Sequence, residues 1–99
     1  MKSGSRLQSQ VCETQAIVVR VSDALSDLRC GGAPMVALDA AKDDALQIDP
    51  TLSGGSLMGK RYVDESGGEV LVTRAGSGTL SVGTTALSLK EAKPLPASD

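Results

Sequence analysis

Arg29-Cys30-Gly31-Gly32-Ala33-Pro34-Met35 is the stretch that decides the fold, because it combines the end of a strand, a tight turn and a return. Two consecutive glycines supply the freedom for a positive φ, and a proline ends the hydrogen-bond ladder of a strand. Apolar residues stand on both sides of the turn, over residues 28–30 and 35–38. We therefore expect two short strands joined by this turn.

A denser β-branched run precedes the turn. Ala16-Ile17-Val18-Val19-Arg20-Val21 has the length and composition of a buried strand. Residues 22–27 are rich in turn formers and return the chain to the next strand. Residues 1–10 are polar, which predicts a frayed start. The first unit is thus expected to contain three strands.

The same pattern returns in the second half of the chain. Residues 66–74 align with residues 12–20 at an offset of 54, and the offset becomes 52 from Leu28 and Leu80 onward. This similarity predicts two related three-stranded units, with chance similarity between Val-rich hairpins as the alternative.

The predicted units occupy residues 1–38 and 57–99, with an acidic Gly/Pro linker over residues 39–56 between them. One or two helical turns over residues 39–48 are the alternative to an open linker. The tail over residues 90–99 is expected to be extended.

Composition excludes several classes of function. The 99 residues suit one small domain, and they include no His, no Phe, no Trp and a single Tyr. A net charge of −2 gives no electrostatic footprint for nucleic acid, and the absence of His removes Ser-His and Cys-His catalysis. No apolar run is long enough to span a membrane. We expect a cytoplasmic protein that is not an enzyme and binds neither nucleic acid nor membrane.

The residues around both cysteines resemble a degenerate rubredoxin or desulforedoxin type zinc ribbon. Cys12-Glu13-Thr14-Gln15-Ala16 stands before the Val-rich strand, where that family carries a Cys-x-x-Cys-Gly knuckle, and residues 28–35 are similar to the second knuckle. Residues 66–70 and 78–83 fit the same frame without cysteines. The resemblance implies an all-β fold of two ribbon-like units packed as a pseudo-dimer.

Most of the metal ligands of that family are missing. The resemblance places its eight ligand positions at Cys12, Gln15, Cys30, Gly31, Ser66, Glu69, Val82 and Gly83. Only two of these are cysteine, whereas a structural metal site needs four good ligands. The sequence therefore predicts no metal and no cofactor in the monomer. The resemblance puts Cys12 and Cys30 on facing turns, as packing thiols, as a redox-switchable or disulfide-bonded pair, or as half of a Cys-four site shared by two chains.

Two hypotheses for function follow. In the first, a metal-free, non-catalytic ribbon-like protein binds a protein partner or forms a homodimer as an accessory subunit. Lys60, Arg61 and Tyr62 are the candidate contact residues, with a solvated strand edge and a core-covering Tyr ring as the plainer alternative. In the second, Cys12 and Cys30 act as the dithiol of a small redox or electron-transfer protein. The glycines of residues 76–78 and 53–56 are interpreted as ordinary turns.

Overall fold

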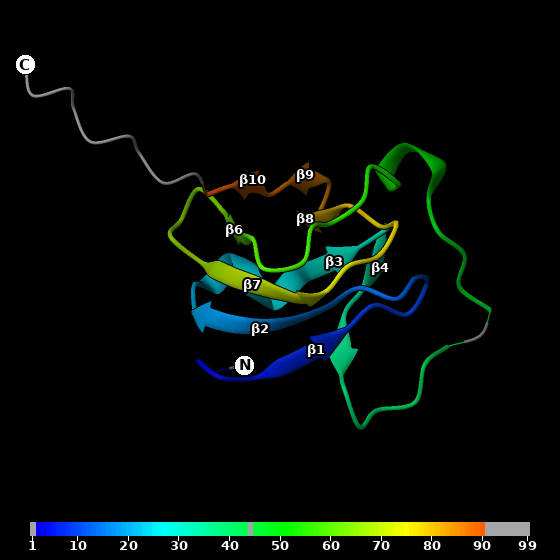
Figure 1. Ribbon diagram of the computed structural model, residues 1–99, viewed down its shortest axis with the longest axis horizontal. Coiled ribbons are helices and arrows are strands. Elements are labelled where there is room, and N and C mark those ends of the chain that lie inside the picture. The colour runs from blue at the N-terminus through cyan, green and yellow to red at the C-terminus, as the bar shows by residue number, and fades with distance from the viewer. Residues whose placement is uncertain (1, 44, 91–99) are drawn as a thin grey trace, which may run out of the picture.

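Ten short β-strands form two antiparallel sheets in the computed structural model, which describes residues 2–43 and 45–90 (Figure 1). The strands are β1 (Arg6–Gln8), β2 (Gln15–Arg20), β3 (Leu28–Cys30), β4 (Ala33–Pro34), β5 (Val36–Ala37), β6 (Arg61–Val63), β7 (Glu69–Arg74), β8 (Leu80–Val82), β9 (Thr85–Ala86) and β10 (Ser88–Leu89). Two short 3-10 helices, η1 (Asp23–Asp27) and η2 (Pro50–Leu52), complete the described elements. The expected all-β class is confirmed.

The two halves of the chain share both sheets. The strand order is β10-β6-β7-β2-β1-β5 in the larger sheet and β4-β3-β8-β9 in the smaller one. Each sheet is joined at its centre by a strand pair between the halves, β2 with β7 and β3 with β8. Counted outward from each central pair, the strands of the first half and those of the second half therefore follow in the same order. The description of this arrangement as a pseudo-dimer stays a prediction.

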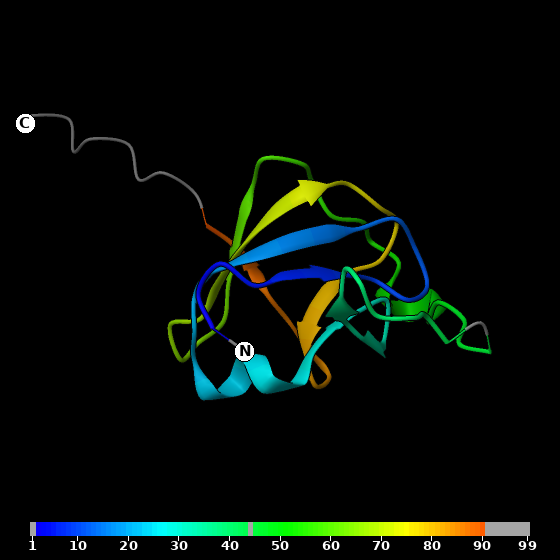
Figure 2. The ribbon, with the colours of Figure 1, turned by 90° about the horizontal axis from the view of Figure 1, so that it is seen from below.

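Alternation along the central strands builds the core. Ala16 and Val18 on β2 are buried opposite Val72 and Val70 on β7, while Val19 is exposed. Side chains of successive strand residues point to opposite faces, so one face of each strand supplies the core. The buried cluster consists of Leu7, Ala16, Val18, Leu25, Leu28, Cys30, Val70, Val72 and Leu80. Figure 2 shows β2 and β7 on one side of the molecule and η1 and β8 on the other.

The third strand predicted over residues 35–38 is wrong in its extent. Only Val36–Ala37 of this range form a strand, β5, which pairs with β1 in the larger sheet, whereas the preceding Ala33–Pro34, expected in the turn, form β4, which pairs with β3. The chain changes sheets at Met35, whose N–H donates to the carbonyl of Leu28. Pro34 lies within β4 because this strand is at the edge of its sheet, where a missing N–H is tolerated. Each half therefore contributes five short strands rather than three.

The frayed start predicted for residues 1–10 is also wrong over residues 4–10, and Met1 lies outside the described residues. Leu7 on β1 is buried, and Ser9 is fully buried at the end of that strand. Polar residues flank Leu7 on both sides in the sequence, so this single apolar residue does not produce a recognisable strand pattern. The turn-rich residues 22–27 form η1 largely because Leu25 packs into the core with no exposed surface.

The segment over residues 39–56 does more than link two units. No helical turn forms over residues 39–43 and 45–48, so the helical alternative is not what the structure shows. The Asp49 N–H donates to the carbonyl of Gly31, and the carbonyl of Leu52 accepts from the Thr79 N–H. This segment therefore contacts both halves of the chain. Of the predicted extended tail, residues 91–99 lie outside the described residues.

A buried carboxylate fixes the edge of the larger sheet. Glu69, whose side chain is 8% exposed, accepts hydrogen bonds from Lys90 Nζ at 2.9 Å and Arg61 Nη1 at 3.4 Å. The hydrogen bond from Lys90, aided by the nearby positive charges, holds the pKa of Glu69 below its usual value of 4.5. These contacts tie Lys90, just after β10, to β7 and β6.

We expect Glu69→Gln to lower the free energy of unfolding by about 1 kcal/mol at neutral pH, since both cationic partners are half-exposed and water weakens the pairs. Because the pKa of Glu69 is lowered on folding, its contribution is present above pH 4.5 and is lost as the pH falls through the folded pKa. Urea unfolding at neutral and acidic pH should therefore show a difference between variant and wild type that disappears in acid. The exposed Glu65 offers the matched control, Glu65→Gln, for which no such difference is expected. An equal loss of stability at both pH values would contradict this role for the Glu69 charge.

Candidate functional site

The structure brings the two cysteines together. Cys12 lies in the loop between β1 and β2, Cys30 ends β3, and their Sγ atoms are 3.7 Å apart. Both thiols are free. Cys30 has no exposed surface, whereas Cys12 is half-buried. The pair therefore has one thiol within reach of solvent and one enclosed in the core.

Hydrogen bonds within the loop over residues 9–14 set the position of Cys12. The buried Ser9 hydroxyl accepts the N–H groups of Val11 and Cys12, both at 3.1 Å. The Ser9 N–H donates in turn to the carbonyl of Thr14. These hydrogen bonds join the two ends of the loop and hold Cys12 in the turn between them.

The Thr14 hydroxyl lies beside the sulfur of Cys12. Thr14 Oγ1 is 3.2 Å from Cys12 Sγ and 2.7 Å from the hydroxyl oxygen of Ser56. Thr14 and Ser56 are both buried. Ser56 also pairs with Gly76 through their main chains, which connects the thiol site to the second half of the chain.

A glycine loop from the second half covers the thiol pair. The Gly78 N–H donates to Cys12 Sγ at 3.3 Å. A Cβ atom added at Gly78 would lie 2.8 Å from Cys30 Sγ, and one added at Gly76 would lie 3.0 Å from Cys12 Sγ. Real side chains do not tolerate such approaches in a packed interior. Glycine is therefore required at both positions so that this loop can reach the sulfurs.

The surroundings make the two thiols chemically different. Burial raises the pKa of Cys12, but hydrogen bonds with the side chains of Ser9 and Thr14 and with the backbone of Thr14 and Gly78 outweigh it. The net effect lowers the pKa of Cys12 from 9.0 to about 7. Burial raises the pKa of Cys30 to about 12, and the neighbouring charge of Cys12 adds to the rise. Near neutral pH, Cys12 is thus available as a thiolate while Cys30 keeps its proton.

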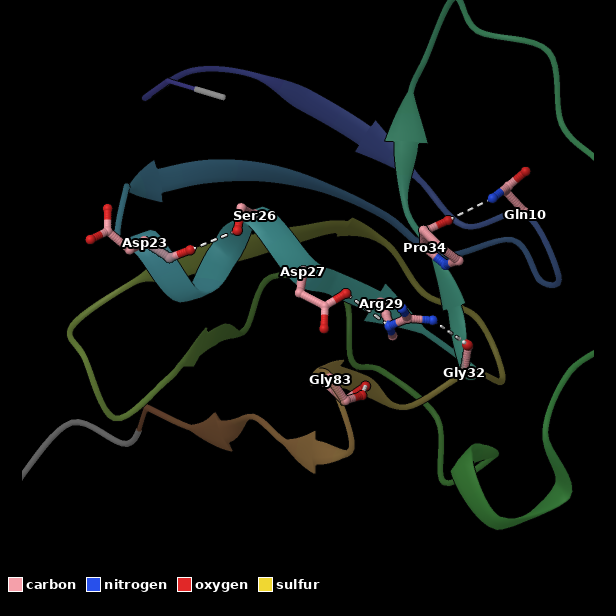
Figure 3. A network of polar contacts seen from close by, with 9 residues as sticks. Gln10, Asp23, Ser26, Asp27, Arg29, Gly32, Pro34 and Gly83 are labelled. Carbon is pink, nitrogen blue, oxygen red and sulfur yellow. Dashed lines mark hydrogen bonds and ion pairs between the residues drawn. The ribbon is translucent and has the colours of Figure 1, made fainter.

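Arg29 takes no part in this activation, although it precedes Cys30 in the sequence. Figure 3 shows its guanidinium group held by Asp27 and by the carbonyl of Gly32. The Arg29 Nε to Asp27 Oδ1 distance is 3.0 Å. In the same view Gln10 Nε2 donates to the carbonyl of Pro34, which ties the start of the Cys12 loop to β4. Hydrogen bonds from neutral donors, not a cation, therefore favour the thiolate of Cys12.

Of the predicted contact residues, Lys60 and Arg61 are exposed and Tyr62 is half-buried, and their contact with a partner stays a prediction. Arg61 is paired with Glu69, and Tyr62 packs partly buried against the core, with its hydroxyl accepting the Leu57 N–H. Lys60 is exposed. Of the plainer alternative, the Tyr62 ring packs against the core as expected, whereas β6 is not an edge strand because it lies between β10 and β7.

The sequence singled out Cys12 and Cys30 but missed the residues that surround them. The polar sequence predicts a frayed start around Ser9, the zinc-ribbon resemblance places Thr14 within a knuckle, and residues 76–78 have the pattern of an ordinary turn. Two closely spaced glycines were the available signal for a close approach, but nothing local shows which residues they approach. Among residues 2–43 and 45–90, no three Cys, Asp or Glu side chains gather as a metal-binding group.

Comparison of the chain with protein-family models, with curated proteins and with solved structures finds no match. The resemblance to a zinc ribbon therefore stays an expectation from the sequence. Over the described part of the chain, no helix has the length and apolar content needed to cross a membrane.

Proposed function

We propose that the protein is a small thiol–disulfide redox protein in which Cys12 and Cys30 interconvert between a dithiol and an intramolecular disulfide. The observation that carries this proposal is the 3.7 Å separation of two free sulfurs in unlike surroundings. A structural thiol needs only to be packed, whereas this pair combines a half-buried thiol, activated by hydrogen bonds, with an enclosed partner. Such pairing is what a reactive dithiol requires.

The two cysteines take different roles in this chemistry. Cys12 is the attacking thiol, because it is the one near solvent and its thiolate forms near neutral pH. Cys30 is the resolving thiol, because it lies behind Cys12 in the core. Oxidation removes two electrons and two protons from the pair, which a disulfide or hydroperoxide oxidant accepts, and a dithiol reductant returns them.

Disulfide formation requires only a small movement of the two sulfur atoms. The sulfurs must close from 3.7 Å to about 2.05 Å, the length of a disulfide bond. Cys30 is part of a paired strand, so we expect the movement to come from the loop that holds Cys12. Disulfide formation also weakens the hydrogen bond that the Gly78 N–H donates to Cys12 Sγ, since a disulfide sulfur is a weaker acceptor than a thiolate.

The partner-binding role expected from the sequence stays a prediction. Two exposed apolar side chains, Leu57 and Met58, stand near exposed Lys60 and favour it. The pairing of Arg61 and the partial burial of Tyr62 leave it with fewer contact residues than expected. The thiol pair is therefore the better supported site.

Symmetric main-chain contacts support the interpretation of the chain as two related units. The Gly31 N–H donates to the Thr79 carbonyl at 3.0 Å, and the Gly83 N–H donates to the Asp27 carbonyl at 3.2 Å. Each residue of the first bond stands 52 positions from its counterpart in the second. Only the first half carries cysteines, so one redox pair is expected per chain.

We expect a low pKa for the half-buried thiol of Cys12. The rate at which iodoacetamide alkylates Cys12 should reach half its maximum near pH 7, because hydrogen bonds stabilise the thiolate. Mass spectrometry of labelled peptides measures this rate separately for each cysteine, and Cys30 should remain unlabelled until the protein is unfolded. Cys12→Ser is the control, since the folded variant should take up no label. A midpoint near the ordinary value of 9.0 would contradict the proposed activation.

A further inference from the structure

Cys12 Sγ is surrounded closely on several sides. Thr14 Oγ1 stands at 3.2 Å, the Gly78 nitrogen at 3.3 Å and Cys30 Sγ at 3.7 Å. The main chain at Gly76 approaches so closely that an added methyl group would lie 3.0 Å from the sulfur. An attacking group therefore has limited room at this atom.

The hollows found in the described part of the chain lie away from the thiol pair. Two hollows are found among the described residues, of about 280 Å³ and 410 Å³. The first is lined by residues of η1, the turn after β6 and the segment after β8, and the second by residues of β1, β2 and β7. Neither hollow is lined by Cys12 or Cys30. Exchange with a protein disulfide needs three sulfurs in line and space for the chain that carries two of them, and the close neighbours of Cys12 Sγ restrict that space.

We infer that the oxidant of the Cys12–Cys30 pair is a small hydroperoxide, which reaches Cys12 Sγ from the exposed side of this half-buried residue. This inference rests on the proposed redox function and names its substrate class. A hydroperoxide needs to place only one oxygen atom at the sulfur. The Gly78 N–H, which donates to the sulfur, suits the negative charge that develops in the reaction, and the Thr14 hydroxyl, which accepts from the Cys12 thiol, is able to donate once that thiol has lost its proton.

The reaction balances in two steps. The Cys12 thiolate attacks the terminal oxygen of ROOH, so that an S–O bond forms, the O–O bond breaks, and the departing RO⁻ takes a proton from water to give ROH. Cys12 is then a sulfenic acid. Cys30 loses its proton to solvent and attacks Cys12 Sγ, so that the S–S bond forms, the S–O bond breaks, and hydroxide leaves and is protonated to water. The dithiol is oxidised by two electrons and the hydroperoxide is reduced by two.

Thr14 is a positioning residue in this scheme. Its hydroxyl contacts both Cys12 Sγ and the Ser56 hydroxyl, so it is fixed in place beside the reacting atom. Thr14→Val should slow oxidation by hydrogen peroxide and raise the pKa of Cys12, whereas Thr14→Ser keeps the hydroxyl and should restore both. A merely structural role would leave the alkylation midpoint of Cys12 unchanged.

The test compares hydrogen peroxide with glutathione disulfide as oxidants of the full, reduced chain at equal concentration. Intact mass follows the loss of two hydrogens, and we expect hydrogen peroxide to act at least about tenfold faster, since access limits the larger disulfide. In Cys30→Ala, hydrogen peroxide should add one oxygen atom to Cys12, as a sulfenic acid that dimedone traps. The control Cys12→Ser should react with neither oxidant.

The outcomes separate this inference from the function on which it rests. If glutathione disulfide oxidises the pair as fast as hydrogen peroxide, the hydroperoxide inference is wrong and the dithiol function stands. If neither oxidant produces the Cys12–Cys30 disulfide, both are wrong. Rapid oxidation by peroxide without a trappable sulfenic acid in Cys30→Ala would contradict the two-step route.

Discussion

Oxidation of Cys12 and Cys30 to a disulfide should raise the free energy of unfolding by about 3 kcal/mol, because it closes a loop in the unfolded chain. The two residues are 18 positions apart, and the bond constrains every conformation that the unfolded segment between them can adopt. Because the two sulfurs are already 3.7 Å apart in the folded protein, the bond requires little movement of the chain, and we expect most of this stabilisation to be retained. Urea unfolding of the same preparation with and without dithiothreitol measures the difference directly.

Cys12→Ser provides the control for that measurement. The variant keeps the packing of Cys30 in the core but forms no intramolecular bond, so its unfolding midpoint should not depend on reductant. A wild-type midpoint that stays the same or falls on oxidation would mean that the disulfide strains the fold, and would argue against a built redox pair.

Gly76→Ala should destabilise the protein by about 2–3 kcal/mol, the cost expected for forcing an extra methyl group into a packed region. The added Cβ would lie 2.5 Å from the Thr14 nitrogen and 3.0 Å from Cys12 Sγ. A backbone atom cannot rotate away as a flexible side chain does, so the glycine loop must move off the thiol site. Thermal unfolding monitored by circular dichroism measures the loss.

Ser77→Ala is the matched control for Gly76→Ala because it alters the same loop at an exposed side chain. Its effect on stability should lie within about 0.5 kcal/mol. The Gly76→Ala variant should also shift the alkylation midpoint of Cys12 upward, since displacement of the loop withdraws the Gly78 N–H from the sulfur. Equal stability of the two variants would contradict the close packing of the loop on the thiols.

The local features of the fold could be read from the sequence because they depend on neighbouring residues. Strand β3 covers residues 28–30 as predicted, and Gly31 and Gly32 adopt the positive φ angles, 66° and 89°, expected at the turn. The β-branched run gave β2 to within one residue at each end. Alternation and turn chemistry act over a few residues, so they are visible in the chain alone.

Features that depend on tertiary packing were not visible. Burial of Leu7 turns a polar segment into β1, and the change of sheets at Met35 separates β4, which was expected to be part of the turn, from β5. In the site, the pairing of Cys12 with Cys30 followed from the resemblance, whereas the approach of Gly76 and Gly78 did not. That approach arises because β3 pairs with β8 and brings the second half over the first.

A redox titration of the full chain in glutathione buffers, read by intact mass after acid quenching, tests the central claim most directly. The account predicts one reversible transition between the dithiol and a monomer lighter by two hydrogens, with the bond mapped to Cys12 and Cys30. A chain that stays reduced across the whole series, or that forms only disulfide-linked dimers or mixed disulfides, would contradict it.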